Sequence, residues 1–236
     1  MQVTPMTPFA VVKIAPAVSK NTQAYEQLKQ ALLSATFRAG DVLSLRGLAD
    51  LLGTSTMPVR EAVTRLIAER ALEALPNRGV RVPVLTQHQA RDIFRMRITL
   101  EPLAAEMAAS VITDAELEQL ELYQRQFVDA LQRQQVQEAV RANIQFHLSL
   151  ARASRSETII AFIETLYLRV APSLYTVVEK LPSPTSAFVE AHHNPILAAL
   201  RSRDAPRTRA AIEVDMGPWT IGSDAVDTAA TRTCDP

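Results

Sequence analysis

Residues 44–82 read SLRGLADLLGTSTMPVREAVTRLIAERALEALPNRGVRV, and the spacing of their apolar residues changes along the way. Residues 44–53 and 54–70 carry apolar residues three and four positions apart, which is typical of amphipathic helices. Gly53, between them, is a good helix C-terminal cap. After these helices, the short runs ALEAL and VRVPV flank the turn PNRG (76–79), as in a β-hairpin. The segment therefore predicts two helices followed by a hairpin.

The same spacing predicts which side chains these two helices bury. They are Leu45, Leu48, Leu51 and Leu52 on the first helix and Val59, Ala62, Val63 and Leu66 on the second. Ser55 can cap the second helix, and Pro58 is tolerated in its first turn. A further amphipathic helix, 22–35, precedes them. Three helices and a hairpin within one short segment predict a winged helix-turn-helix.

Beyond the hairpin, the sequence predicts helices throughout. We expect them near 87–109, 114–133, 136–153, 156–180, 186–202 and 206–216. Two starts have capping-box spacing, Thr86 with Gln89 and Thr113 with Glu116. Pro195 should kink the fifth helix or mark its start, and Gly217-Pro218 should end or bend the sixth. The expected fold is mainly α, with an N-terminal winged helix-turn-helix and a C-terminal all-helical antiparallel bundle.

Length and composition limit the class of protein. The chain has 236 residues, 47% of them hydrophobic, and a single cysteine, Cys234, which excludes an intrachain disulfide framework. Neither a long apolar run nor a signal peptide is apparent, so we expect a soluble, cytoplasmic protein without membrane association. Net charge is zero, with an excess of Lys and Arg near the N-terminus. We expect disordered tails at 1–18 and 223–236, a DNA-binding domain at 19–83 and a helical domain at 84–222.

The second helix of a helix-turn-helix lies in the major groove, where its first side chains reach base edges. Arg60 lies off the apolar face of helix 54–70, and its guanidinium can pair with guanine. Hydroxyls and backbone N–H groups at the helix start can meet phosphate, and the hairpin tip can enter the minor groove. The candidate DNA-binding residues are Arg46, Ser55, Thr56, Met57, Arg60, Asn77, Arg78 and Gly79. The alternative interpretation is an ordinary solvated helix surface.

Residues 40–82 resemble the N-terminal domain of GntR-family bacterial transcription regulators. The family pattern G-x-x-L-x-x-x-x-L-A-x-x-L-G-V-S-R-T-P-V-R-E-A-L-x-x-L-x-x-E-G-L-V, followed by P-x-R-G-x-x-V, matches without a gap. This resemblance implies a homodimer that binds a near-palindromic double-stranded DNA operator. Thr56-Met57 replaces the usual Arg-Thr and removes a base or phosphate contact. Ala71 stands where a helix-ending glycine is usual, which costs about 1 kcal/mol if that backbone needs a positive φ.

Residues 82–109, VPVLTQHQARDIFRMRITLEPLAAEMAA, resemble the linker and first helix of the FadR-like subgroup, whose C-terminal domain is a helical effector-binding (FCD-type) bundle. Many members hold a divalent metal with one Asp and three His. NIQFH (143–147), HHNPILAAL and AAIEVDM match the ligand-bearing segments, and they imply the ligands Asn143, His147, His193 and Asp215. Two of these four are changed from the family set. Their nitrogen and oxygen atoms suit Zn²⁺, Mn²⁺ or Ni²⁺, and the alternative is a pair of hydrogen-bonded core histidines.

An acidic effector needs a cation in its pocket. The resemblance places Arg97 on the first helix of the bundle, and Arg169 on helix 156–180 is a weaker candidate. The alternative for Arg97 is an ion pair with Glu101, four residues later. The sequence thus predicts a ligand-responsive regulator, a repressor of genes for metabolism of a small carboxylate, associated with DNA in the bacterial cytoplasm.

Two other functions remain open from the sequence. One is a helical metalloenzyme with a DNA-binding head, in which two histidines and a carboxylate activate water. Against it, no adjacent general base and no H-E-x-x-H motif is present, so we expect no enzymatic activity. The other is a constitutive DNA-binding dimer whose bundle binds no effector.

Overall fold

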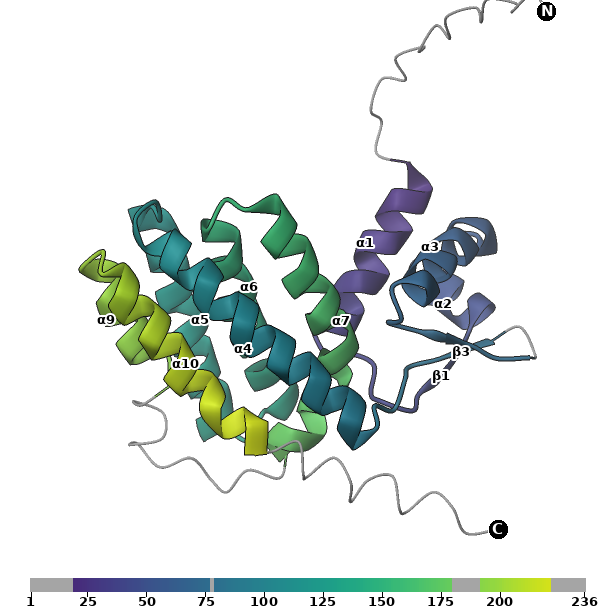
Figure 1. The fold of residues 1–236 in the computed structure, drawn as a ribbon. Helices are drawn as coiled ribbons and strands as arrows, with labels where there is room; N and C mark the ends of the chain where they lie inside the picture. The colour runs from purple at the N-terminus through teal and green to yellow at the C-terminus, as the bar shows by residue number, and fades with distance from the viewer. Residues whose placement is uncertain (1–18, 77–78, 180–191, 222–236) are drawn as a thin grey trace, which may run out of the picture.

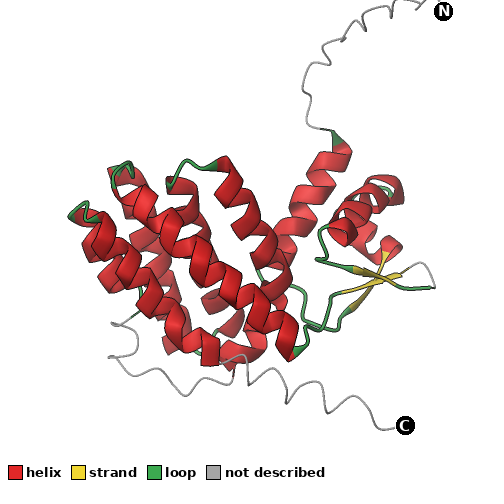
Figure 2. Cartoon of the chain, in the orientation of Figure 1, coloured by secondary structure: helices red, strands yellow, loops and turns green. Residues whose placement is uncertain are grey.

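The computed structural model describes residues 19–76, 79–179 and 192–221 (Figures 1 and 2). Within these residues, the first elements form a winged helix-turn-helix, here called the head. Its elements are α1 (Lys20–Leu33), β1 (Val42–Ser44), α2 (Leu45–Leu51), α3 (Thr56–Ala68), β2 (Glu73–Ala74) and β3 (Gly79–Arg81). The mainly helical fold predicted from the sequence is confirmed.

The apolar face of α3 forms the centre of the head. Val59, Ala62, Val63 and Leu66 are all buried, as their spacing predicts, and α1 packs across them. The prediction for α2 is wrong at Leu51, which is 60% exposed. That helix spans only seven residues, so Leu48 and Ala49 are the residues that it buries.

The turns of the head agree with the expected chemistry at one glycine but not elsewhere. Gly53 has a φ of 61° just after α2, as a C-terminal glycine should. Ser55 is the N-cap of α3, but its side chain makes no capping hydrogen bond. The expected strain at Ala71 is also misplaced. The positive φ, 58°, belongs to Arg70, directly after Glu69, where the family pattern has its glycine.

The wing is a three-stranded antiparallel sheet in the order β1-β3-β2. The hairpin strands β2 and β3 were expected, with Ala74 opposite Val80. β1 was not, because three residues before a helix are too few to show an alternation. Leu43 pairs with Val80, which is buried, so β1 closes the sheet over the head core.

The remaining described helices form the antiparallel bundle, seen at the left of Figure 1. They are α4 (Gln87–Ala109), α5 (Asp114–Gln132), α6 (Val136–Ala153), α7 (Glu157–Glu179), α9 (Asn194–Arg201) and α10 (Ala205–Ile221). Both predicted capping boxes are present, at Thr86 and at Thr113. Pro195 marks the start of α9, as one of the two expectations had it. The expected start of that helix at residue 186 lies outside the described residues.

One predicted boundary in the bundle is wrong. Gly217-Pro218 does not end the last helix, because α10 continues to Ile221; the alternative, a bend at these residues, stays a prediction. A proline removes one backbone hydrogen bond from a helix without preventing the following residues from adopting helical angles.

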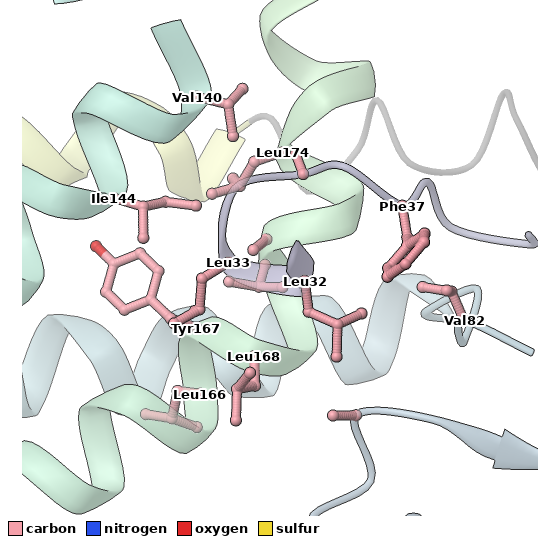
Figure 3. Close-up of a cluster of buried hydrophobic side chains, with 14 of the residues drawn as sticks. Leu32, Leu33, Phe37, Val82, Val140, Ile144, Leu166, Tyr167, Leu168 and Leu174 are labelled. Atoms are coloured by element: carbon pink, nitrogen blue, oxygen red, sulfur yellow. The ribbon is translucent and has the colours of Figure 1, made fainter. Parts of the chain in front are cut away.

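Head and bundle share one hydrophobic cluster. Figure 3 shows Leu32 and Leu33 of α1 beside Tyr167 and Leu174 of α7, and all four are buried. Next to this contact, Lys29 Nζ lies 2.6 Å from a carboxylate oxygen of Glu164 on α7. The head is therefore held to the bundle by apolar packing and an ion pair between α1 and α7.

Candidate metal centre and nucleic-acid interface

Three of the four predicted metal ligands come together inside the bundle. His147 lies on α6, His193 directly precedes α9, and Asp215 lies on α10. One ligand atom of each lies within 4.8 Å of the others, and all three side chains are buried. The packing of three helices thus gathers residues that are far apart in the sequence.

The cluster contains buried polar atoms without hydrogen-bond partners in the described part of the chain. Among them are Nε2 of His193 and both carboxylate oxygens of Asp215. Leaving such atoms buried and unsatisfied costs about 1–3 kcal/mol each. A bound cation would satisfy them together, so this donor set fits a divalent metal. The fourth predicted ligand, Asn143, is buried on the same helix face as His147, one turn away.

The ring of His193 is fixed on both its edge and its face. Its Nδ1 lies 2.6 Å from Oε1 of Gln124 on α5, and the ring stacks on Phe146 at 3.9 Å between centroids. An amide oxygen can only accept, so Nδ1 carries the proton and Nε2 keeps its lone pair. Burial is the main reason why the pKa of His193 lies well below its usual value, and the charges of His147 and His192 lower it further. His193 is therefore a neutral imidazole with Nε2 available for a ligand bond.

His147 lies between two carboxylates. Its Nδ1 is 3.0 Å from Oε2 of Glu101, and its Nε2 is 3.4 Å from Oδ2 of Asp215. Burial raises the pKa of Glu101, but Arg97 and His147 outweigh this effect and hold it at about 2. Burial also raises the pKa of Asp215. A divalent cation would oppose that rise by favouring the carboxylate form.

The two predicted effector-binding arginines lie in different places. Arg97 is buried, with Nε 2.6 Å from Glu101 Oε1 and an Nη2 hydrogen bond to the hydroxyl of Tyr167. This is the ion pair that the sequence offered as the alternative. Arg169 is half-buried on α7, and burial and the charge of Arg70 in the head lower its pKa.

Sequence reasoning missed the residues that hold the histidines. Gln124 and Tyr167 carry no motif, and they meet the cluster only through the packing of α5 and α7. Glu101 was noticed as a partner of Arg97 but not as a neighbour of His147. The buried glutamine on a helix face with apolar neighbours was the one available signal.

The predicted DNA-binding side chains lie on the exposed surface of the head. Arg46, Ser55, Thr56 and Arg60 are exposed, and Met57 is 64% exposed although apolar. Neither the Arg46 nor the Arg60 side chain makes a hydrogen bond or ion pair within the described residues. Gly79 begins β3, whereas Asn77 and Arg78 lie outside the described residues. The surface thus presents free cations where the groove contact was predicted.

Comparison with known proteins identifies relatives over most of the chain. Residues 20–82 match the model of the gntR family of bacterial regulatory proteins, and residues 92–216 match the FCD domain. The chain is 30% identical to the HTH-type transcriptional regulator McbR of Escherichia coli K12, over 79% of this chain and 85% of that protein. It is 27% identical to the HTH-type transcriptional repressor RspR of the same organism, over 81% and 83% respectively.

The fold is also similar to a solved structure. E. coli McbR/YncC superimposes with a TM-score of 0.79 at 27% identity, covering 88% of this chain and 98% of that chain. No helix in the described part of this chain is long and apolar enough to cross a membrane.

Proposed function

Since this chain belongs to the gntR family of bacterial regulatory proteins and carries an FCD domain, we propose that it is a ligand-responsive repressor. Members of this family are DNA-binding transcription regulators rather than enzymes. The observation that carries the finer proposal is the buried cluster of His147, His193 and Asp215, whose unsatisfied ligand atoms suit a metal; a bound metal would in turn attract an acidic effector. The related protein RspR is named a repressor, which supports repression rather than activation for this chain.

We place α3 in the major groove, with Arg60 reading a base and Arg46 at the phosphate backbone or groove. Exposure and the lack of a protein partner for either side chain in the described residues support this placement. We propose 19–83 as the DNA-binding domain and 84–222 as the effector-binding and dimerisation domain, acting in the bacterial cytoplasm.

In the proposed centre, His147 and His193 supply imidazole nitrogens and Asp215 supplies a carboxylate oxygen. Asn143 completes the set through its amide oxygen. Zn²⁺, Mn²⁺ and Ni²⁺ accept such mixed nitrogen and oxygen ligands. A bound cation would attract the carboxylate of an acidic effector, while Arg97 and Glu101 keep His147 in place.

A near-palindromic operator contains two equivalent half-sites. A repressor that binds both of them needs two heads, so we propose a homodimer. A stripe of large apolar side chains on α4 supports it: Met96, Leu103 and Met107 are 46%, 38% and 39% exposed. Their spacing of seven and four residues places them on one face of the helix. Such a stripe suits burial against a second copy.

An electrophoretic mobility shift assay with DNA taken from beside the gene tests the proposal. The purified chain should retard this DNA specifically, and one of a panel of small hydroxy- and keto-acids should release it. Release requires that the acid binds the DNA-free arrangement better than the DNA-bound one. Specific retardation that no acid changes, together with unchanged thermal stability in every acid, would indicate a constitutive dimer instead.

A further inference from the structure

A hollow lies between the head and the bundle. It measures about 420 Å³, within the range of small-molecule sites. Helix α1 and its C-cap contribute Gln30 and Ser34, α5 contributes Tyr123 and Gln126, and α6 contributes Arg141 and Gln145. A molecule in this hollow would touch both the head and the bundle.

The chemistry of the lining favours an anion. Arg141 is the one charged side chain among the described residues that line the hollow, and no carboxylate lines it there. The amides of three glutamines and the hydroxyl of Tyr123 add neutral hydrogen-bond donors around this cation. A guanidinium surrounded by neutral donors suits a carboxylate or phosphate group and would repel a cation.

These donors are not used by the protein itself. Within the described residues, the side chains of Arg141, Gln30, Gln126 and Gln145 make no hydrogen bond or ion pair. Other arginines of the bundle do: Arg133 pairs with Asp129, Arg152 with Glu164 and Arg155 with Glu116. Arg141 is thus free to meet a ligand in the same way as Arg46 and Arg60 are free to meet DNA.

The hollow is separate from the metal cluster. On α6, Asn143 and His147 are buried toward the cluster, while Arg141 is exposed and Gln145 is half-buried. Residues two positions apart on a helix do not face the same way. A ligand at Arg141 would therefore lie on a different face of α6 from a metal at His147.

We propose that this hollow is a second ligand site, for a small anion that carries a carboxylate or phosphate group. Arg141 is its counter-charge, and glutamine amides from both head and bundle are its hydrogen-bond partners. Because α1 forms one wall, an occupied site holds the head against the bundle. The site goes beyond the proposed effector at the metal cluster and does not depend on a metal.

The test uses the full chain, dialysed against chelator so that the metal cluster cannot capture the probe. Sodium phosphate and sodium succinate are titrated separately, with sodium chloride at equal ionic strength as the reference, and the Tm is followed by fluorimetry. The wild-type Tm should rise and saturate with at least one anion. Arg141→Gln should weaken the apparent affinity about tenfold or more, since it removes a charge-assisted contact.

Two further variants make the result specific. Arg125→Gln removes an exposed arginine of α5 outside the hollow and should respond like wild type, which controls for general stabilisation by phosphate. Gln30→Ala, on the head side, should weaken binding as well. A response to phosphate alone or to succinate alone identifies the group that the site accepts. Equal responses in wild type and Arg141→Gln would overturn the site, and an unaffected Gln30→Ala would overturn the bridging of head and bundle.

Discussion

At the scale of single residues, we propose that the guanidinium of Arg60 reads a base of the operator. It is exposed on α3 and has no partner within the described residues. We expect Arg60→Ala to abolish specific retardation of operator DNA, because a bidentate contact to guanine contributes roughly 1–3 kcal/mol. A mobility shift titration measures the loss. Arg133→Ala, which removes an exposed arginine of the bundle, should leave binding unchanged; intact specific binding by Arg60→Ala would show that another residue reads the base.

Gln124 is a second residue with a separable effect. It fixes the Nδ1 proton of His193 and so directs Nε2 into the cluster. We expect Gln124→Leu to weaken metal binding by about 10–100-fold, as loss of such supporting contacts does elsewhere. Calorimetric titration with Zn²⁺ gives the measurement. Gln124→Glu restores an acceptor and should restore affinity, whereas Gln119→Leu at an exposed position of α5 is the matched control. Equal affinity in Gln124→Leu and Gln119→Leu would contradict the role.

At the scale of elements, the start of α5 is stabilised by charge. Glu116 closes the capping box with Thr113 and accepts two hydrogen bonds from Arg155, at 2.6 and 2.7 Å. The hydrogen bonds from Arg155 are the largest cause of a Glu116 pKa of about 2, against 4.5 for the free group. A lowered folded-state pKa stabilises above the unfolded value, and this stabilisation is lost as pH falls from 4.5 toward 2.

The prediction concerns the difference between wild type and Arg155→Gln. The wild type should have the higher Tm at neutral pH, and the gap should shrink as the pH falls below about 4.5, because protonated Glu116 no longer pairs. Thermal melts across this range give the answer. Arg133→Gln, whose partner Asp129 is 62% exposed, should show a smaller gap at neutral pH. A gap that is constant with pH would exclude the ion pair as its cause.

The apolar stripe on α4 supports a prediction about assembly. We expect Leu103→Arg to shift the chain from dimer to monomer, since a buried charge without a partner is costly at an interface. Light scattering after size-exclusion chromatography reads the mass directly. Leu122→Arg alters an equally exposed leucine of α5 and should remain dimeric. If Leu103→Arg keeps the mass of wild type, the two-fold contact lies elsewhere.

At the scale of the whole molecule, the proposed metal site gathers side chains from helices that are distant in sequence. A ligand that binds only the folded chain stabilises it by about 2.7 kcal/mol at a hundred times its Kd. Adding Zn²⁺, Mn²⁺ or Ni²⁺ to chelator-treated protein should therefore raise the Tm, with one ion bound per chain by elemental analysis. His147→Ala should lose both effects, while His88→Ala, at an 84% exposed side chain, should keep them. If His147→Ala retained the metal, His147 would not be a ligand and the metal site would lie elsewhere.

The packing of α1 on α7 also belongs to this scale. Leu32 and Leu33 are buried against the bundle, and Lys29 pairs with Glu164 across the same contact. Each buried leucine contributes roughly 1.5–3 kcal/mol relative to an exposed one. The head and the bundle therefore share one hydrophobic cluster, and α1 is the element that joins the DNA-binding helices to α7.

The sequence by itself determined the head, most of the described helices and two of their caps. Apolar spacing located α3 and its buried stripe, and the capping boxes at Thr86 and Thr113 located two helix starts. These features depend on residues three or four positions apart, so they are visible in a single chain. The sequence did not predict β1, because a strand of three residues is too short to show an alternation. It also predicted too early an end for α10, because this helix continues through a proline.

Only the tertiary structure decided how the site is built. Gln124 and His193 are 69 residues apart, and Tyr167 and Arg97 are 70 apart, so no local pattern could pair them. Their contacts depend on how whole helices pack, because each helix must bury its apolar face against several others at once. The same packing committed Arg97 to an ion pair and left Arg141 free in the hollow beside the head.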